Sequence, residues 1–263
     1  MLLTKNKWLW IIIVIISTKI LCAGTIRHDV DESKYLNHAA KYKTIVKIYG
    51  NIKSPKEKNL EISASAVLIK PKWILTAAHV ISCSKDQYIV IGEDNKRYDL
   101  DLIIIHKDFN ENIPVSMNDI AIGRLSSKVE EINEFPILYS DKKEENKICS
   151  ISGYGMYGTG ITGAKTFDLK KRAGTNRIIS VNEYMLMCDM TENKKNQTIL
   201  EFLPAHGDSG GGLFIDGKLA GINSFVTSTD KKPDSNYGDE SAHTRISTFK
   251  PWIIETIKKH ENE

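Results

Sequence analysis

Residues 207–212 read Gly-Asp-Ser-Gly-Gly-Gly and set a serine hydroxyl on a turn made almost entirely of glycine. Glycine tolerates positive φ and leaves room for another backbone to approach, so such a turn can expose Ser209 to a substrate. The same turn can direct its own N–H groups at one point, where they would stabilise a developing oxyanion. A serine hydroxyl is a weak nucleophile by itself, so this interpretation needs a base and an acid elsewhere in the chain.

Two further segments of the sequence supply a base and an acid. Residues 73–80 read Trp-Ile-Leu-Thr-Ala-Ala-His-Val, an apolar strand that runs into small residues and a single histidine. Residues 118–125 read Asn-Asp-Ile-Ala-Ile-Gly-Arg-Leu, in which an acid opens an alternating apolar run. We predict that Ser209 attacks, that His79 accepts its proton, and that Asp119 orients and stabilises the imidazolium. Each residue alone has a common structural role, but the three together favour a catalytic triad.

With these motifs the chain resembles the trypsin/chymotrypsin-like serine proteases over about residues 44 to 260. The matching stretches are Leu75–His79, Asn118–Ala121 and Gly207–Gly211, with weaker matches at residues 152–155, 221–225 and 243–247. The order His, Asp, Ser distinguishes this family from other folds that carry the same trio. We expect a divergent, secreted member of bacterial type.

The resemblance implies an all-β fold of two six-stranded antiparallel β-barrels packed face to face, with a C-terminal α-helix. The expected bounds are about 40–135 for the first barrel, about 136–247 for the second and about 249–260 for the helix. Many short apolar runs separated by turn signals agree with barrels, and Asp216-Gly217 is typical of a hairpin turn. The base and acid would come from the first barrel and the nucleophile from the second, which puts the site between them.

The resemblance also implies how a substrate would be held. The N–H groups of Gly207 and Ser209 would form the oxyanion hole. The residues expected to line the specificity pocket are Leu203 at its floor and, on its walls, Ser224, Phe225, Val226 and Ser241. An aliphatic floor argues against recognition of a basic side chain, so we expect cleavage after small or medium apolar residues. His243 near this pocket leaves a preference for acidic residues as the weaker option.

Residues 1–24 have the order of a secretory signal peptide: two lysines, an apolar run, and then small residues. The apolar run from Trp8 to Ile16 is short for a membrane span. We expect cleavage near Gly24 and a secreted or periplasmic protein without stable membrane association. An uncleaved membrane anchor is the alternative.

The charge of the 263-residue chain, +3 overall, comes from this leader, which holds three lysines and no acid. Its removal leaves the rest of the chain about neutral, so composition gives no case for nucleic-acid binding. We expect a monomer that acts on protein or peptide substrates and needs no metal or other cofactor.

Cysteines are sparse after the leader, where only Cys83, Cys149 and Cys188 remain. An odd number leaves at least one thiol unpaired in a monomer. The family's bridge beside the catalytic histidine is absent, because Ala64 and Val80 occupy those two positions. A Cys149–Cys188 bridge stays open in an oxidising compartment, and the core must hold most of the fold.

Activation departs from the family pattern. The usual zymogen is cut to expose Ile-Val-Gly-Gly, whose amine pairs with the acid before the nucleophile, here Asp208. That tetrapeptide does not occur in this chain. Leader removal would leave a terminus near Gly24 instead, so either this terminus reaches Asp208 or the acid finds another partner.

The sequence therefore predicts a secreted serine endopeptidase, a hydrolase that cleaves peptide bonds through an acyl-enzyme and does not share the trypsin preference for basic residues. The alternative is a non-catalytic protease homologue that acts as a binding or adhesion module. The intact trio of catalytic residue types favours the enzyme.

Overall fold

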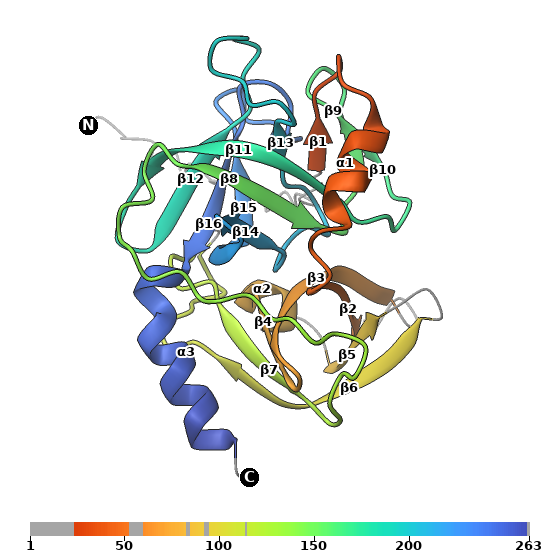
Figure 1. Ribbon diagram of the computed structural model, residues 1–263, viewed down its shortest axis with the longest axis vertical. Helices are drawn as coiled ribbons and strands as arrows, with labels where there is room; N and C mark the ends of the chain where they lie inside the picture. Colours follow the sequence, from red (N-terminus) through yellow and green to blue (C-terminus); the bar gives the residue numbers. More distant parts are fainter. Residues whose placement is uncertain (1–23, 53–59, 83–84, 92–94, 114, 262–263) are drawn as a thin grey trace, which may run out of the picture.

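Two closed β-barrels of six strands each form the body of the protein (Figure 1). The computed structural model describes residues 24–52, 60–82, 85–91, 95–113 and 115–261, so the predicted leader lies outside the described residues except for Gly24. The predicted all-β architecture of two antiparallel six-stranded barrels with a C-terminal helix is confirmed.

The first barrel contains a fully buried strand directly before the segment that carries His79. It closes in the order β2 (Ile45–Ile52), β3 (Leu60–Lys70), β4 (Trp73–Thr76), β7 (Ala121–Leu125), β6 (Lys96–Ile105) and β5 (Lys85–Ile91). In β4, Leu75 pairs with Val67 of β3 on one side and with Ile122 of β7 on the other. All three side chains are fully buried, and each contributes roughly 1.5–3 kcal/mol of apolar burial. The end of this strand is thereby held rigidly where the segment carrying His79 begins.

The second barrel has the same architecture. It closes in the order β11 (Arg172–Val181), β12 (Met185–Asp189), β16 (Glu240–Arg245), β15 (Lys218–Thr227), β14 (Gly212–Ile215) and β8 (Ile148–Gly153). Asp216 and Gly217, with φ of 48° and 74°, make the hairpin turn from β14 to β15. Cys149 and Cys188 are buried free thiols in this barrel, with their sulfur atoms 3.9 Å apart. Cys83 lies outside the described residues.

A further four-stranded sheet, which the sequence did not predict, joins the segment after the leader to the second half of the chain. Its order is β10 (Gly163–Thr166), β9 (Tyr157–Thr159), β1 (Gly24–Ile26) and β13 (Phe202–Leu203). Thr25 pairs in parallel with Gly158 and antiparallel with Leu203. The chain from Gly24 onward is therefore anchored between two strands of the second half.

The described residues form one very short helix, α2 (Ala78–Ser82), and two longer ones (Figure 1). The shorter of these two, α1 (Glu32–Ala39), begins at Asp31, whose side chain accepts a hydrogen bond from the backbone N of Ser33 at 2.8 Å, as an N-cap does. The C-terminal helix α3 (Ile246–His260) buries a face spaced by three and four residues. That face packs into the core of the first barrel and consists of Ile246, Phe249, Ile253 and Ile257. None of the helices in the described ranges is long and apolar enough to cross a membrane.

Candidate active site

His79 and Asp119 meet at one edge of the first barrel. His79 lies in the short helix α2 (Ala78–Ser82) directly after β4, and Asp119 lies just before β7. The Nδ1 atom of His79 is 2.8 Å from Oδ2 of Asp119, and the backbone N of His79 donates to Oδ1 at 2.9 Å. Because a carboxylate can only accept, Nδ1 carries the hydrogen and the neutral ring keeps its acceptor on Nε2. The ring is thus oriented to take a proton on Nε2.

The second barrel covers this carboxylate. Asp119 is only 3% exposed. The hydroxyl of Ser224 in β15 donates to its Oδ2, and the hydroxyl of Thr244 in β16 donates to its backbone carbonyl at 2.8 Å. The sequence placed Ser224 on a pocket wall and did not predict its contact with the acid. The resemblance gave the position of Ser224 in the chain, but the sequence does not indicate in which direction its hydroxyl points.

The pair of His79 and Asp119 favours its charged forms. Burial acts to raise the pKa of Asp119, but the charge of His79 and the hydrogen bonds outweigh burial and hold that pKa below its ordinary 3.8. Enclosure acts to lower the pKa of His79, and the charge and hydrogen bond of Asp119 outweigh it, so that pKa lies above its ordinary 6.5. An imidazolium formed at His79 is therefore stabilised.

Ser209 lies on the glycine turn between β13 and β14, partly exposed to solvent. Gly207 and Gly210 have φ of 90° and 81°, which side chains other than glycine rarely adopt. The turn is closed by two backbone bonds, from the N of Asp208 to the carbonyl of Ala205 at 2.7 Å and from the N of Gly211 to the carbonyl of Asp208 at 2.9 Å. The tight path of the turn leaves Ser209 partly exposed.

The first barrel holds this turn through Ser65 of β3, a residue that sequence reasoning missed. The backbone N of Ser65 donates to the carbonyl of Ser209 at 2.9 Å, and its hydroxyl donates to the carbonyl of Gly207 at 2.7 Å. A Cβ on Gly210 would collide with the Ser65 carbonyl and with Thr76, three residues before His79. These contacts bring Ser209 to the edge that carries His79 and Asp119.

Replacing Ser65 by alanine should lower the free energy of unfolding by about 1–3 kcal/mol, because two buried groups lose their partner. These groups are the carbonyl of Gly207 and the N–H of Tyr154, which donates to the Ser65 hydroxyl at 2.9 Å. Urea unfolding measures the loss. Ser63→Ala in the same strand is the matched control, because the Ser63 hydroxyl has no hydrogen-bond partner among the described residues. Equal destabilisation by both changes would contradict this account.

The residues expected to line the specificity pocket lie in three strands of the second half. Leu203 is fully buried in β13, next to β1. Phe225 and Val226 are half-buried in β15. Ser241 is fully buried in β16, where it pairs with Val226.

The sequence left open that His243 near the pocket could favour acidic substrate residues. In the structure, His243 is a buried residue that holds its neighbours together. Its ring is fully buried, with Nδ1 2.9 Å from Oδ1 of Asn223 and Nε2 2.9 Å from the hydroxyl of Ser241. Burial lowers its pKa to about 3, so the ring is neutral at physiological pH. A neutral ring with both nitrogens engaged does not favour an acidic substrate side chain.

Asp208, the acid before Ser209, is enclosed by backbone groups. Its Oδ1 accepts from the N of Gly155 at 2.7 Å and its Oδ2 from the N of Ala205 at 2.9 Å. A Cβ added to Gly24 would collide with the same carboxylate. Burial raises the pKa of Asp208 to about 7, an effect that two backbone bonds and the more distant charge of Arg172 only partly offset. The carboxyl therefore lacks an adjacent cation among the described residues, and the backbone of Gly24 lies against it.

No group of three or more His, Cys, Asp or Glu side chains within the described ranges is arranged to hold a metal ion.

Comparison with known proteins gives a consistent result. The family model described as Trypsin matches residues 39–253. Mast cell protease 3 of Ovis aries is 24% identical over 209 residues, which cover 74% of this chain and 78% of that protein. Kallikrein-7 of Homo sapiens is 27% identical over 224 residues, which cover 76% of this chain and 79% of that protein.

Two solved structures share the fold. HL collagenase superimposes with a TM-score of 0.65 at 21% identity, over 82% of this chain and 94% of that one. Neuropsin, a serine protease expressed in the limbic system of mouse brain, superimposes with a TM-score of 0.62 at 21% identity, over 88% of this chain and 98% of that one.

Proposed function

The chain belongs to the trypsin family of serine proteases, and on that premise we propose that it is an active, secreted serine endopeptidase with the triad His79, Asp119 and Ser209. The observation that carries the proposal is the 2.8 Å contact from Nδ1 of His79 to a buried Asp119, beside a glycine turn that exposes a serine. This arrangement provides a nucleophile, a base oriented by its contact with a carboxylate, and a fixed counter-charge.

The reaction would proceed in two halves. The Oγ atom of Ser209 attacks the carbonyl carbon of a peptide bond while Nε2 of His79 takes the hydroxyl proton. The N–H groups of Gly207 and Ser209 stabilise the oxyanion, and His79 returns the proton to the departing amine, which leaves an acyl-enzyme. Water then attacks the ester with the same base, which releases the acid and restores Ser209.

We propose cleavage after small or medium apolar residues. The aliphatic Leu203 offers no charge to a lysine or arginine, and Val226 beside Ser241 occupies space along the pocket wall. Incubation of the secreted protein with a peptide library tests both reaction and preference. Products should end in small or medium apolar residues, and pretreatment with a fluorophosphonate should stop their release. Absence of cleavage would refute the enzyme, and cuts chiefly after arginine or lysine would refute the preference.

The dependence of kcat/KM on pH should follow the protonation of His79. Its neutral form is the base, and its pKa lies above 6.5 because the charge of Asp119 outweighs enclosure of the ring. We therefore expect kcat/KM to fall as the pH drops, with a midpoint above 6.5. Initial rates on one peptide across the acid and neutral range give this midpoint. A flat profile down to pH 5 would be inconsistent with a histidine base.

We also propose that removal of the leader near Gly24 is the activating step. Gly24 is the first residue of β1, its N donates to the carbonyl of Met156 at 3.0 Å, and its backbone lies against Asp208. Cleavage before Gly24 would turn that N into an amine beside a buried carboxyl with a raised pKa. An ion pair formed there would hold the turn that carries Ser209. The released protein would be a secreted or periplasmic monomer that acts on protein substrates, without nucleic acid or a stable membrane contact.

A further inference from the structure

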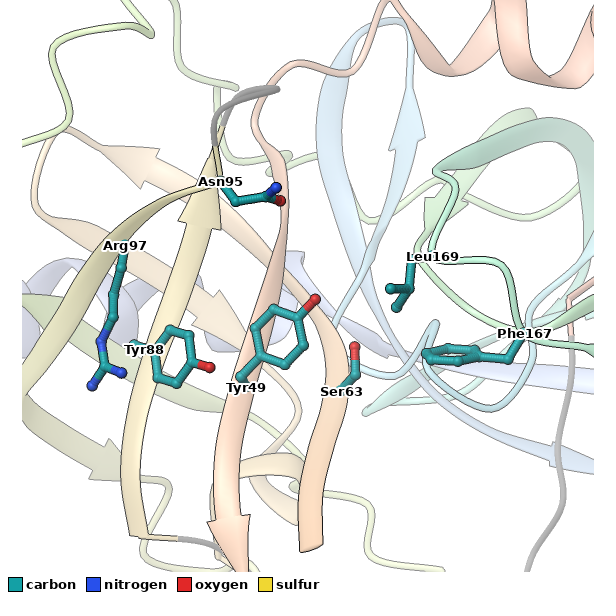
Figure 2. A pocket seen from close by; sticks show the side chains of 7 residues that line it. All are labelled: Tyr49, Ser63, Tyr88, Asn95, Arg97, Phe167 and Leu169. Carbon is teal, nitrogen blue, oxygen red and sulfur yellow. The ribbon is translucent and has the colours of Figure 1, made fainter. Parts of the chain in front are cut away.

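A recess beside the nucleophile turn has no role in the chemistry described so far. Its volume is about 530 Å³. Figure 2 shows Tyr49 and Ser63 of the first barrel on one side and Phe167 and Leu169, from the segment between β10 and β11, on the other. The recess thus lies between the two halves of the molecule, as the predicted substrate cleft does.

The walls of the recess are mostly apolar. Phe167 and Leu169 are 45% and 43% exposed, and both line the recess with apolar surface. Leu169 also has a φ of 60°, a strained conformation for a side chain of this kind. On the facing wall the ring of Tyr49 stacks on Tyr88 with centroids 5.4 Å apart. Tyr49 and Phe167 thus lie on opposite sides of the space (Figure 2), and aromatic side chains on two sides of a gap suit a bulky apolar side chain.

Polar groups also line the recess, among them the hydroxyl of Ser63 and the positively charged guanidinium of Arg97. The hydroxyl of Ser63 is buried without a hydrogen-bond partner in the described part of the chain, and it points into the space between Tyr49 and Leu169 (Figure 2). A bound peptide backbone could supply that partner. At the far end the guanidinium of Arg97 lies over the Tyr88 ring at 3.8 Å. Its positive charge disfavours a basic side chain.

The recess is continuous with the reacting centre. Phe167 lies beside Gly207, because a Cβ on Gly207 would be 3.5 Å from the Phe167 ring. Ser63 lies two residues before Ser65, which binds the carbonyls of Gly207 and Ser209. A peptide that leaves Ser209 along β3 would therefore pass from the oxyanion turn directly into the recess.

The strands around the turn indicate which side of the scissile bond the recess would contact. β15 meets the nucleophile turn at Gly210 and Gly211, through bonds with Asn223 of 2.8 Å each, and it continues into the expected pocket wall. β3 meets the turn at Gly207 and Ser209 instead. An extended substrate whose acyl side lies against β15 must leave Ser209 on the β3 side. The recess therefore faces the leaving-group part of the substrate.

We propose that this recess selects protein substrates that carry a bulky aromatic or aliphatic side chain shortly after the scissile bond. This inference rests on the proposed function. The side chain would sit between Tyr49 and Phe167, with the adjacent backbone accepting a hydrogen bond from Ser63. The enzyme would thus read its substrate on both sides of the cleaved bond.

The test uses internally quenched peptides that share one acyl side and differ after the scissile bond. Phenylalanine, alanine or lysine is placed in turn at each of the first three positions of the leaving group. Filling an apolar pocket changes kcat/KM by roughly 10–200-fold. For this partly open recess we expect about a tenfold preference for phenylalanine over alanine at one position, with lysine the poorest.

Phe167→Ala is the diagnostic variant, and Ser63→Ala is the second. Phe167→Ala should reduce the phenylalanine-to-alanine ratio to about one. The ratio cancels any general effect of the variant on the chemical step. Ser63→Ala should lower kcat/KM about fivefold on every extended peptide, without lowering the unfolding midpoint. Ile199→Ala, at a position 83% exposed and outside the recess, is the matched control and should keep the parent ratio.

The outcomes separate the two proposals. A parent protein that cleaves none of the peptides and does not react with a fluorophosphonate overturns the proposed function and this inference together. A parent that reacts and cleaves the alanine and phenylalanine peptides equally at all three positions overturns this inference alone. A ratio that survives in Phe167→Ala also overturns it.

Discussion

Replacement of Ser209 by alanine is expected to lower kcat by about 10⁶-fold, because the triad acts as a unit and its nucleophile has no substitute. The oxyanion turn and substrate binding remain, so about 10³–10⁴-fold acceleration over water should persist. Hydrolysis of one good peptide by the parent and the variant, followed over hours for the variant, measures the loss.

The control for this change is Ser127→Ala, which removes an exposed serine hydroxyl outside the site. It should keep the parent rate, and Ser209→Ala should keep the parent unfolding midpoint because Ser209 contacts β3 through its backbone. A Ser209→Ala protein that still cleaves casein at the parent rate would assign the activity to another group.

A chain that begins at Gly24 is expected to be about 10²–10³-fold more active than one that retains two extra residues before Gly24. The extra residues remove the amine from Asp208 and leave a buried carboxyl without an adjacent cation, a loss typically equal to 3–5 kcal/mol. Asp208→Asn in the Gly24 chain should cause a similar loss. In the extended chain the same substitution should add little, because the pair is already broken.

The free energy of unfolding of the extended chain should also depend on pH. Burial raises the pKa of Asp208 from its ordinary 3.8 to about 7 in the folded chain, so the folded state holds this proton more tightly than the unfolded one. Below pH 3.8 the proton on Asp208 makes its full contribution to the free energy of unfolding. As the pH rises through 7 this contribution is lost, and the free energy of unfolding falls by about 4 kcal/mol. The Gly24 chain should lose less over this range. Equal activity and equal pH dependence in the two chains would mean that the new amine does not reach Asp208.

The two-barrel architecture could be predicted through the family resemblance, which rests on short motifs around His79, Asp119 and Ser209. Strand periodicity, the hairpin residues Asp216 and Gly217, and the contexts of His79 and Ser209 are each visible within a few residues. Barrel closure itself depends on pairing between strands far apart in the chain, such as β4 with β7, where Leu75 pairs with Ile122.

The contacts that complete the site were not predictable in the same way, because they join residues far apart in the chain. Ser65 reaches Ser209 across the two barrels, and Ser224 donates to Asp119 over a separation of 105 residues. A serine in a strand gives no sign of its partner. The position of Gly24 beside Asp208 depends on β1, a strand of three residues that is too short for a periodic signal.

Helix α1 was missed although it carries a local signal. Asp31 followed by Glu32 and Ser33 is a sequence typical of a helix start, and its buried residues Tyr35 and Ala39 are four apart. The Tyr35 hydroxyl donates to the carbonyl of Glu201 at 3.2 Å, which fixes the segment after the predicted leader against the second half of the chain.

The most direct test of the central claim is covalent labelling of the secreted protein with a fluorophosphonate, followed by digestion and mass spectrometry. The triad predicts one adduct per chain, on the peptide that contains Ser209, with labelling abolished by prior unfolding and strongly slowed in His79→Ala. No adduct on the folded protein, or an adduct on a different serine, would contradict the assignment of Ser209 as the nucleophile.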